Sequence, residues 1–237
     1  MTILYDVIII GAGAAGMMSA IEAGKRGRKV LLVDHYKKIG EKIRISGGGR
    51  CNFTNINTNP SKFLSQNPKF VRSALSQYTQ NDFINLINKY DIKFHEKKLG
   101  QLFCDHSAQQ IVEMLLKECE LANVTILKEF VIKEIDKENN QYNVSTETDK
   151  YSSQSLIVAT GGLSVPKIGA TSFGYEIAKK FDHDIIETIP ALVPLTFNEK
   201  ILEMCKELTG LSVEAIVSFN KTLFQEGMLF THRGLSG

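Results

Sequence analysis

The sequence predicts an α/β fold, with a Rossmann-like domain followed by a mostly β region. An apolar strand over residues 5–10 runs into the glycine turn Gly11-Ala12-Gly13-Ala14-Ala15-Gly16, and a helix-forming run and a second apolar strand, 29–33, follow it. Beyond Pro190, strand-like pieces replace the alternation of strands and helices. Strand, tight glycine turn, helix and strand form the context in which this glycine pattern binds a dinucleotide.

Each position of the first turn has a physical role in such a site. Gly11 permits the tight turn, Gly13 lets the backbone approach a pyrophosphate, and Gly16 lets the helix pack closely on the strand. The start of the helix offers N–H groups and a partial positive charge to phosphates. Asp34 ends the second strand, near the spacing at which a carboxylate accepts hydrogen bonds from the adenosine ribose. That carboxylate would repel a 2′-phosphate, so NADP is not expected at this site.

Periodicity and turn residues predict the remaining elements in chain order. A loop over 35–59 precedes helices at 69–78 and 81–90, a hairpin around Gly100, a helix at 108–121, strands at 124–127, 131–135 and 142–146, a buried strand at 156–159 and a helix at 175–181. Strand-like pieces at 192–197, 211–219 and 222–230 complete the chain. We therefore expect a dinucleotide-binding α/β domain over 1–190 and a β-rich domain over 191–237.

Three further glycine clusters favour FAD over a nicotinamide dinucleotide as the bound cofactor. They lie at 40–52, where three successive glycines stand beside two arginines, at Thr160-Gly161-Gly162 after the buried strand, and at 169–174. A nicotinamide dehydrogenase needs only the first fingerprint, whereas a flavin needs several loops to enclose its ring. Each cluster also has a plain alternative, namely a surface loop at the first, an ordinary turn at the second and a helix cap at the third.

Composition sets broader limits. The 237 residues carry a net charge of +2 and are 43% hydrophobic, which is enough for a substantial core. The lysines are scattered and no apolar run approaches membrane-spanning length, so neither a nucleic acid nor a membrane is expected as a partner. The four cysteines have no disulfide or zinc spacing, and no metal site is visible. We expect a cytoplasmic protein that acts on a small-molecule substrate; the oligomeric state is not indicated.

Four motifs make the chain resemble a known family. They are GEKIRISGGGRCNFTN (40–55), LIVATGGLSVP (156–166), PALVPL (190–195) and MLFTHRGLSG (228–237). In this order they resemble the HI0933-like (aminoacetone oxidase or BaiN type) FAD-dependent oxidoreductases. The resemblance implies a flavoprotein with two dinucleotide-binding-type domains, in which an FAD-binding α/β domain is interrupted by a mostly β insert. It also implies that the chain later returns to complete the FAD domain at the flavin.

The family motifs assign cofactor-binding roles to residues of this sequence. By resemblance, Gly11, Gly13, Ala14, Ala15 and Gly16 would hold the pyrophosphate, and Asp34 the ribose. A second set would line the path from ADP to flavin: Lys42, Ser46, Gly48, Gly49, Arg50, Cys51 and Asn52. Val131 would give backbone contacts to adenine, and Thr160 and Gly161 would close over the dinucleotide.

Members of this family are longer, and this chain stops inside the last motif. The expectation is therefore a truncated protein that lacks the returning segment and part of the insert domain.

The flavin would supply redox chemistry, with hydride passing between it and a nicotinamide, NAD(P)H, or a small substrate. Three residues are catalytic candidates, each with an alternative role. Arg50 could stabilise negative charge on reduced flavin or contact a phosphate. Cys51 could be a redox thiol, but with no partner cysteine nearby in the sequence a packing role competes. His232 could donate a proton near the ring or be a structural histidine of the insert.

Three hypotheses about function remain open at this stage. The first is an FAD-dependent oxidoreductase of the HI0933-like family. The second is a flavoprotein similar to the tRNA uridine-modifying GidA-type proteins, which begin with the same fingerprint; the near-neutral charge argues against it. The third is an inactive fragment that binds no FAD.

Overall fold

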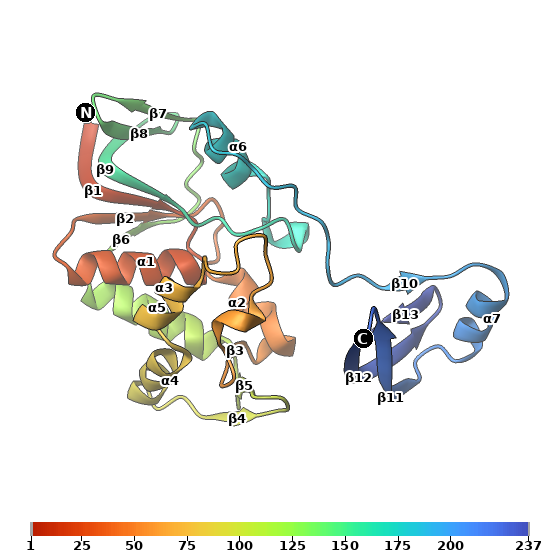
Figure 1. The fold of residues 1–237 in the computed structure, drawn as a ribbon. Helices are drawn as coiled ribbons and strands as arrows, with labels where there is room; N and C mark the ends of the chain where they lie inside the picture. The colour runs from red at the N-terminus through yellow and green to blue at the C-terminus, as the bar shows by residue number, and fades with distance from the viewer. Residues whose placement is uncertain (1, 237) are drawn as a thin grey trace. The chain divides into compact units, whose positions relative to one another are not determined.

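A computed structural model describes residues 2–236, which form two compact units, Met1–Ile185 and Ile186–Gly237 (Figure 1). The strands of the first unit are β1 (Thr2–Ile10), β2 (Val30–Val33), β3 (Asn52–Asn55), β4 (Phe94–Glu96), β5 (Gln101–Cys104), β6 (Thr125–Leu127), β7 (Glu134–Glu138), β8 (Gln141–Ser145) and β9 (Lys150–Val158). Its α-helices are α1 (Ala14–Lys25), α2 (Glu41–Ile45), α3 (Arg72–Gln77), α4 (Gln80–Lys89), α5 (Gln109–Leu121) and α6 (Phe173–Lys180). Single 3₁₀ turns lie at η1 (Ser46–Gly49), η2 (Pro60–Lys62) and η3 (Pro166–Ile168).

The large sheet has the strand order β6-β2-β1-β9-β8-β7. The first four strands pair in parallel, whereas β8 and β7 add an antiparallel edge. This is the Rossmann-like α/β arrangement that the glycine turn and its flanking strands predict, so the predicted fold class is confirmed. The carboxyl ends of β1, β2 and β9 lie side by side, where ligands bind in sheets of this kind.

Alternating residues of the central strand face two separate cores. Ile9 of β1 packs with α1 and α5, which lie side by side against one face of the sheet (Figure 1). Ile8 and Ile10 point to the other face and pack with Val144 of β8 and Ile177 of α6. Burial of both faces explains why β1 and β2 end in unbroken apolar runs.

Three elements of the first unit differ from the sequence-based prediction. Strand β9 begins at Lys150, six residues earlier than expected, because its polar first half lies between β1 and β8. Strand β7 begins at Glu134, not at Val131, because the chain from 128 to 132 runs past the end of β2 instead: the Phe130 N–H donates to the Asp34 carbonyl at 3.0 Å. The loop expected over 35–59 contains α2, η1 and β3.

The second unit is a small antiparallel sheet with one helix. It contains β10 (Leu195–Thr196), α7 (Glu199–Glu207), β11 (Ser212–Phe219), β12 (Thr222–Thr231) and β13 (Gly234–Ser236), in the sheet order β10-β13-β12-β11. Helix α7 was not predicted, although its amphipathic sequence buries Cys205. That these units are an FAD-binding domain and an insert domain stays a prediction. Gly237, the last residue of the fourth motif, lies outside the described residues.

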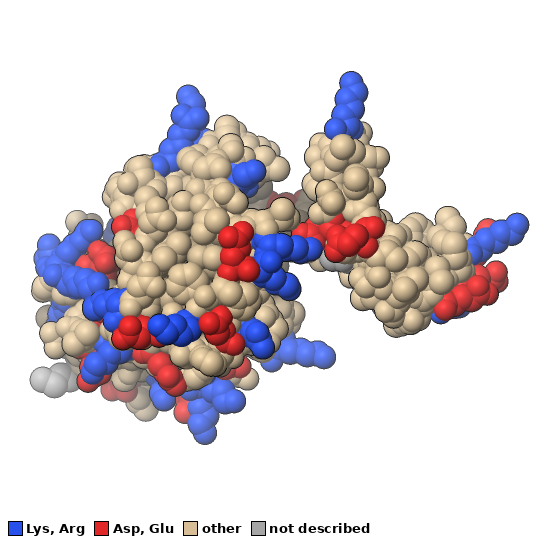
Figure 2. Space-filling model, turned by 90° about the horizontal axis from the view of Figure 1, so that it is seen from below, with Lys and Arg blue, Asp and Glu red and all other residues tan. Residues whose placement is uncertain are grey.

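Charges of both signs are interspersed on the face shown in Figure 2, in keeping with the small net charge. Within residues 2–236, none of the helices is both long enough and apolar enough to cross a membrane.

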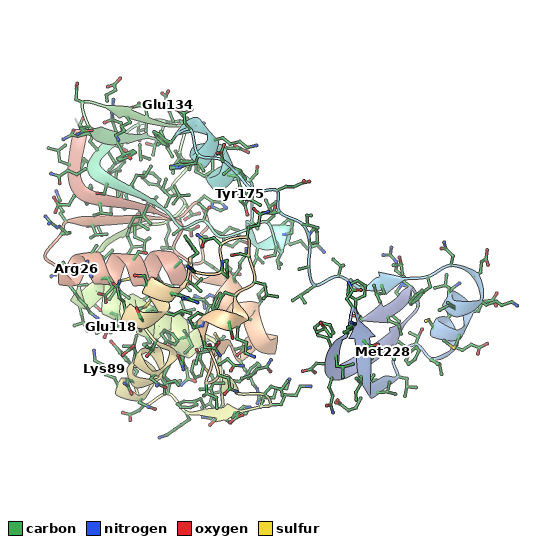
Figure 3. The ribbon with its side chains drawn as sticks, viewed as in Figure 1. Arg26, Lys89, Glu118, Glu134, Tyr175 and Met228 are labelled. Atoms are coloured by element: carbon green, nitrogen blue, oxygen red, sulfur yellow. The ribbon has the colours of Figure 1, made fainter. Side chains whose placement is uncertain are left out.

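A buried carboxylate joins three helices of the first unit. Glu118 of α5 has a side chain only 2% exposed. It accepts a hydrogen bond from Lys89 Nζ at 2.6 Å (Figure 3). The Tyr90 hydroxyl donates to the same oxygen at 2.8 Å, and Lys25 Nζ of α1 lies 3.0 Å from the other oxygen. Burial by itself raises the pKa of Glu118, but these three donors outweigh burial and hold the pKa at about 2, below the ordinary 4.5.

We expect Glu118→Gln to lower the free energy of unfolding at pH 7 by about 3 kcal/mol, since each unit of pKa depression contributes about 1.4 kcal/mol. The folded-state pKa is depressed, so this stability is present above the unfolded pKa of 4.5 and is lost as the pH falls toward 2. Urea titrations at pH 7, 5 and 3.5 measure the effect. The matched control is Glu120→Gln, an exposed partner of Lys117, which should cost less than about 0.5 kcal/mol. A Glu118→Gln penalty that stays constant from pH 7 to pH 3.5 would contradict the assignment.

Candidate functional site

A cleft of about 450 Å³ lies at the carboxyl ends of β1, β2 and β9. A second hollow of about 360 Å³ adjoins it, and the two share Gly11, Asp34, His35, Thr160 and Gly169 in their walls. The cleft and this second hollow are together called the groove. The predicted cofactor-binding residues that line the 450 Å³ cleft are Gly11, Gly13, Ala14, Ala15, Asp34, Lys42, Ser46, Cys51, Asn52, Thr160 and Gly161.

Two of the three fingerprint glycines are required by packing within the protein. A Cβ on Gly16 would lie 1.8 Å from the Gly11 carbonyl oxygen. A Cβ on Gly11, whose φ is +102°, would lie 2.5 Å from the Ala159 carbonyl oxygen. No residue with a side chain can replace either glycine without moving the backbone.

Gly13 is different, because a Cβ built there meets no heavy atom within 4 Å. Its backbone is extended, with φ −84° and ψ −169°, so the conformation suits any residue. Gly13 is the N-cap of α1, lines the cleft, and is followed by two exposed alanines, with no acidic residue in the first turn. The helix therefore presents open N–H groups and an unopposed partial positive charge to the cleft, the arrangement that binds phosphate.

The carboxylate of Asp34 is fixed by two backbone donors. Its Oδ2 accepts from the Ala12 N–H at 2.7 Å and its Oδ1 from the Tyr36 N–H at 2.8 Å. The first bond ties the end of β2 to the glycine turn. Each carboxylate oxygen can accept more than one hydrogen bond, so both retain a lone pair for hydroxyl groups of a ligand.

Val131 lies in the second hollow, away from the main cleft. It is 58% exposed and is flanked by Phe130 and Ile132, which also line this hollow. The segment from 128 to 132 reaches this position because β6 ends beside Asp34, whose N–H donates to the Leu127 carbonyl at 3.0 Å. The result is a small, largely apolar chamber next to the carboxylate of Asp34.

The opposite rim of the cleft is formed by the loop after β9. Lys42 of α2 reaches across to it and donates to the Gly162 carbonyl at 2.8 Å. Gly169 in this loop has a φ of +89°, and a Cβ there would lie 2.9 Å from His35 Nε2. The loop is thus held against the residues that follow Asp34, with a lysine ammonium group at the cleft.

The structure separates the predicted residues of the SGGGRCN motif. Ser46, Cys51 and Asn52 line the cleft, whereas Gly48, Gly49 and Arg50 do not. Arg50 is exposed, and its carbonyl accepts from the Cys104 N–H at 2.9 Å. Three successive glycines, residues 47–49, all have positive φ, so this turn requires glycine for conformational reasons alone.

Cys51 is buried, and burial raises the pKa of its thiol even though a hydrogen bond with Ser46 acts in the opposite direction. Cys104, also buried, lies close enough that burial and then the charge on Cys51 raise the pKa of Cys104 to about 11. The sequence had indicated no neighbouring cysteine. Both thiols are therefore protonated at neutral pH, the state typical of packed cysteines.

His232 is exposed in the turn between β12 and β13 of the second unit. Across residues 2–236, no three His, Cys, Asp or Glu side chains gather as a metal site requires.

Sequence reasoning missed the apolar wall of the cleft. Phe53 of β3, Phe83 of α4, and Ile111 and Leu115 of α5 line it. On a helix such residues are typical of a core face, and no local pattern distinguishes a core from the wall of a cleft. The glycine cluster at 169–174 was a sequence signal for the site, although helix capping explained it equally well. The structure places Gly169 of this cluster in the walls of both hollows.

Comparison with known proteins identifies relatives of the whole chain. The model of the HI0933-like protein Rossmann domain matches residues 5–232. A ribosomal RNA dihydrouridine synthase of Escherichia coli is 50% identical over 98% of this chain and 58% of its own length. A protein of the same description from Haemophilus influenzae is 46% identical over 97% and 58%. A 3-dehydro-bile acid delta(4,6)-reductase of Clostridium scindens is 26% identical over 79% and 46%. The chain thus spans somewhat more than half the length of the two most similar of these proteins.

Gly13 and Gly16 of the fingerprint differ in packing, so alanine substitutions at these two positions test whether the groove binds a phosphate. We expect Gly13→Ala to leave the melting temperature nearly unchanged and to weaken FAD binding about tenfold or more, because its methyl group would occupy the space facing the phosphates. Gly16→Ala, the control, should destabilise the fold by more than about 3 kcal/mol, because its Cβ clashes with the Gly11 carbonyl. Thermal unfolding and quenching of flavin fluorescence measure the two effects. Equal FAD affinity in Gly13→Ala and the unmodified protein would exclude a phosphate at this turn.

Proposed function

The chain belongs to the HI0933-like family of FAD-dependent oxidoreductases, and from that premise we propose that it binds FAD in the groove and reduces a carbon–carbon double bond of its substrate. The observation that carries the proposal is Gly13, which no contact within the protein requires to be a glycine. A pyrophosphate bound at the start of α1 would require glycine there, because a side chain would occupy the space facing the phosphates.

The chemistry of the groove fits an extended FAD molecule. The amides at the start of α1 would hold the pyrophosphate, Asp34 the ribose hydroxyls, and the chamber beside Val131 the adenine. The flavin would then extend along the cleft toward Cys51 and Asn52, where Phe83, Ile111 and Leu115 supply an apolar wall. Glu41 Oε1 supports this fit: it pairs with Arg44 Nε at 3.2 Å, yet it is buried and accepts no well-aligned hydrogen bond from residues 2–236.

When bound and reduced, FAD supplies a hydride. The protein residues would orient the cofactor and exclude water. The fixed carboxylate of Asp34 sets the position of the ribose, and the wall from α4 and α5 keeps one side of the cleft dry. Lys42, an ammonium group already at the rim, places positive charge beside the path of the pyrophosphate and ring.

The names of the relatives point to one kind of substrate bond. Dihydrouridine is uridine with two hydrogens added across the C5=C6 bond, which is conjugated to a carbonyl group. A delta(4,6)-reductase of a 3-dehydro-bile acid likewise acts on double bonds that are conjugated to a ketone. We infer that the shared step adds a hydride to one carbon and a proton to the other across a carbon–carbon double bond activated by a carbonyl, with the electron pair supplied by reduced flavin. For this chain we propose uridine in ribosomal RNA as the substrate, on the strength of 50% and 46% identity, and NAD(P)H as the electron donor.

A second candidate is the small-molecule substrate that the sequence composition favoured. The relative that supports it is the bile acid reductase, at 26% identity. An unsaturated cyclic ketone would use the same hydride step without any contact to a nucleic acid.

The test begins with the absorbance spectrum of the purified chain. We expect oxidised-flavin bands and, after denaturation, about one FAD released per protein, because the groove already holds contacts for adenine, ribose, pyrophosphate and ring. The FAD-loaded protein with NADH or NADPH should then add two hydrogen atoms to uridine in a ribosomal RNA transcript, as read by mass spectrometry of the nucleosides.

Gly13→Ala is the matched control for both steps, since it should fold but retain less FAD. A protein that stays colourless after incubation with FAD would overturn the proposal at the cofactor. Bound FAD with turnover of an unsaturated ketone and none of RNA would favour the second candidate.

A further inference from the structure

The basic residues of the chain are distributed unevenly. Residues 35–78, here called the basic segment, contain eight of the 28 Lys and Arg residues but only one of the 26 Asp and Glu residues, Glu41. The rest of the chain holds 20 basic and 25 acidic residues, so it is acidic overall. The small net charge of the whole chain conceals this asymmetry because the basic residues are spaced apart in sequence.

The charges of the basic segment are exposed and lack acidic partners. Only Arg44 forms an ion pair, with Glu41. The others are exposed, and among residues 2–236 none pairs with an acidic group: Lys37, Lys38, Lys42, Arg50, Lys62, Lys69 and Arg72. Outside the segment acidic residues outnumber basic ones, and lysines there that pair with glutamates include Lys25, Lys89, Lys117 and Lys133. An exposed excess of positive charge within one segment favours a polyanionic partner.

Exposed aromatic rings alternate with these charges. Lys62 is followed by Phe63, which is 42% exposed, and Lys69 by Phe70, which is 79% exposed. Phe63 and Arg72 also line a hollow of about 350 Å³. Cations that follow a phosphate backbone, with aromatic rings between them on which bases stack, are the means by which proteins bind single-stranded nucleic acid.

The basic segment is continuous with the groove. It starts directly after Asp34, and Tyr36, Lys38 and Lys42 line the 450 Å³ cleft. Its later part, with Phe63 and Phe70, precedes α4, whose Phe83 belongs to the apolar wall of that cleft. A strand bound along the segment would therefore run beside the groove.

We propose that the basic segment is the surface that binds the RNA strand carrying the base to be reduced. The inference rests on the proposed function for its choice of polymer. A base must leave its stack to enter a cleft, and a single strand held by phosphate contacts and ring stacking can present one. Phosphates would contact Lys62, Lys69 and Arg72, and bases would stack on Phe63 and Phe70.

The test measures binding of a fluorescein-labelled oligouridylate of roughly 20 nucleotides by anisotropy, from about 50 to 300 mM KCl, with no electron donor present. The variant Lys62→Gln/Lys69→Gln/Arg72→Gln should bind more weakly, with the slope of log K against log salt reduced in magnitude by about 2, at about 0.7 per lost contact with a single strand. The control, Lys117→Gln/Lys133→Gln/Lys137→Gln, removes the same charge outside the segment and should leave the slope unchanged. Equal slopes in the two triple variants would overturn the proposal.

A second pair of variants separates RNA from polyanions in general. Phe63→Ala/Phe70→Ala should weaken oligouridylate binding roughly tenfold without changing the salt slope, since stacking carries no counterion release. Leu64→Ala, which removes an exposed but non-aromatic side chain, is its control. An equal loss of binding to heparin would show that the rings do not stack on bases, and would overturn the assignment to RNA.

The outcome is independent of the reduction assay. If the chain reduces no uridine but the two salt slopes differ as expected, the binding surface stands and the proposed substrate chemistry falls. If uridine is reduced while the Lys62/Lys69/Arg72 variant binds RNA as the unmodified chain does, the function stands and the surface falls. Thermal unfolding of each variant verifies folding, which the exposure of these side chains should preserve.

Discussion

The close contact between the backbones at the ends of β1 and β9 is the constraint on which the site depends. Gly11 approaches Ala159 and Thr160 so closely that no Cβ fits between them. This contact brings the glycine turn and the Thr160-Gly161 turn to one edge of the sheet, and the bond from the Ala12 N–H to Asp34 brings the end of β2 to the same place. Three strand ends, of which that of β9 is distant in sequence from the other two, thereby enclose one groove. The start of α1, the carboxylate and the loop after β9 follow from that arrangement, since each is attached to one of the three strands.

The sequence predicts those parts of the arrangement that a pattern within a short stretch of residues specifies. The glycine turn, its flanking strands and Asp34 lie within 34 residues and dictate their own geometry. The polar half of β9 gave no such signal. Ser152 and Ser153 are buried in the sheet, and Ser152 donates to Asn143, which in turn donates to Asp136 at 2.7 Å. A strand whose polar side chains satisfy one another across the sheet resembles a loop when its residues are considered one at a time.

The same distinction applies to the candidate site. In the structure most of the predicted turn residues line the groove. Arg50 does not, because the glycine run before it has a conformation that leaves Arg50 exposed outside the groove. The wall from Phe83, Ile111 and Leu115 depends on how α4 and α5 pack, which sequence periodicity cannot specify. The uneven distribution of basic residues is visible in the sequence. Whether it leaves uncompensated charge depends on which lysines pair with acidic residues in the fold. Two of them, Lys25 and Lys89, pair with the buried Glu118, whereas those beside the groove have no acidic partner among residues 2–236.

The pairing of β1 with β9 also bears on how the protein is made. The second residue of the chain pairs with Lys150, and Ile10 pairs with Val158. During synthesis at roughly 5–20 residues per second, β1 therefore waits on the order of ten seconds or more before its central partner exists. Over that interval β2 is the one sheet partner of β1 that exists, and α1 and α5 can cover only the face that carries Ile9. The face that carries Ile8 and Ile10 packs with β8 and α6, which are made later, so one edge and one apolar face of β1 stay open. In such a circumstance nascent chains depend on chaperones to avoid association with one another.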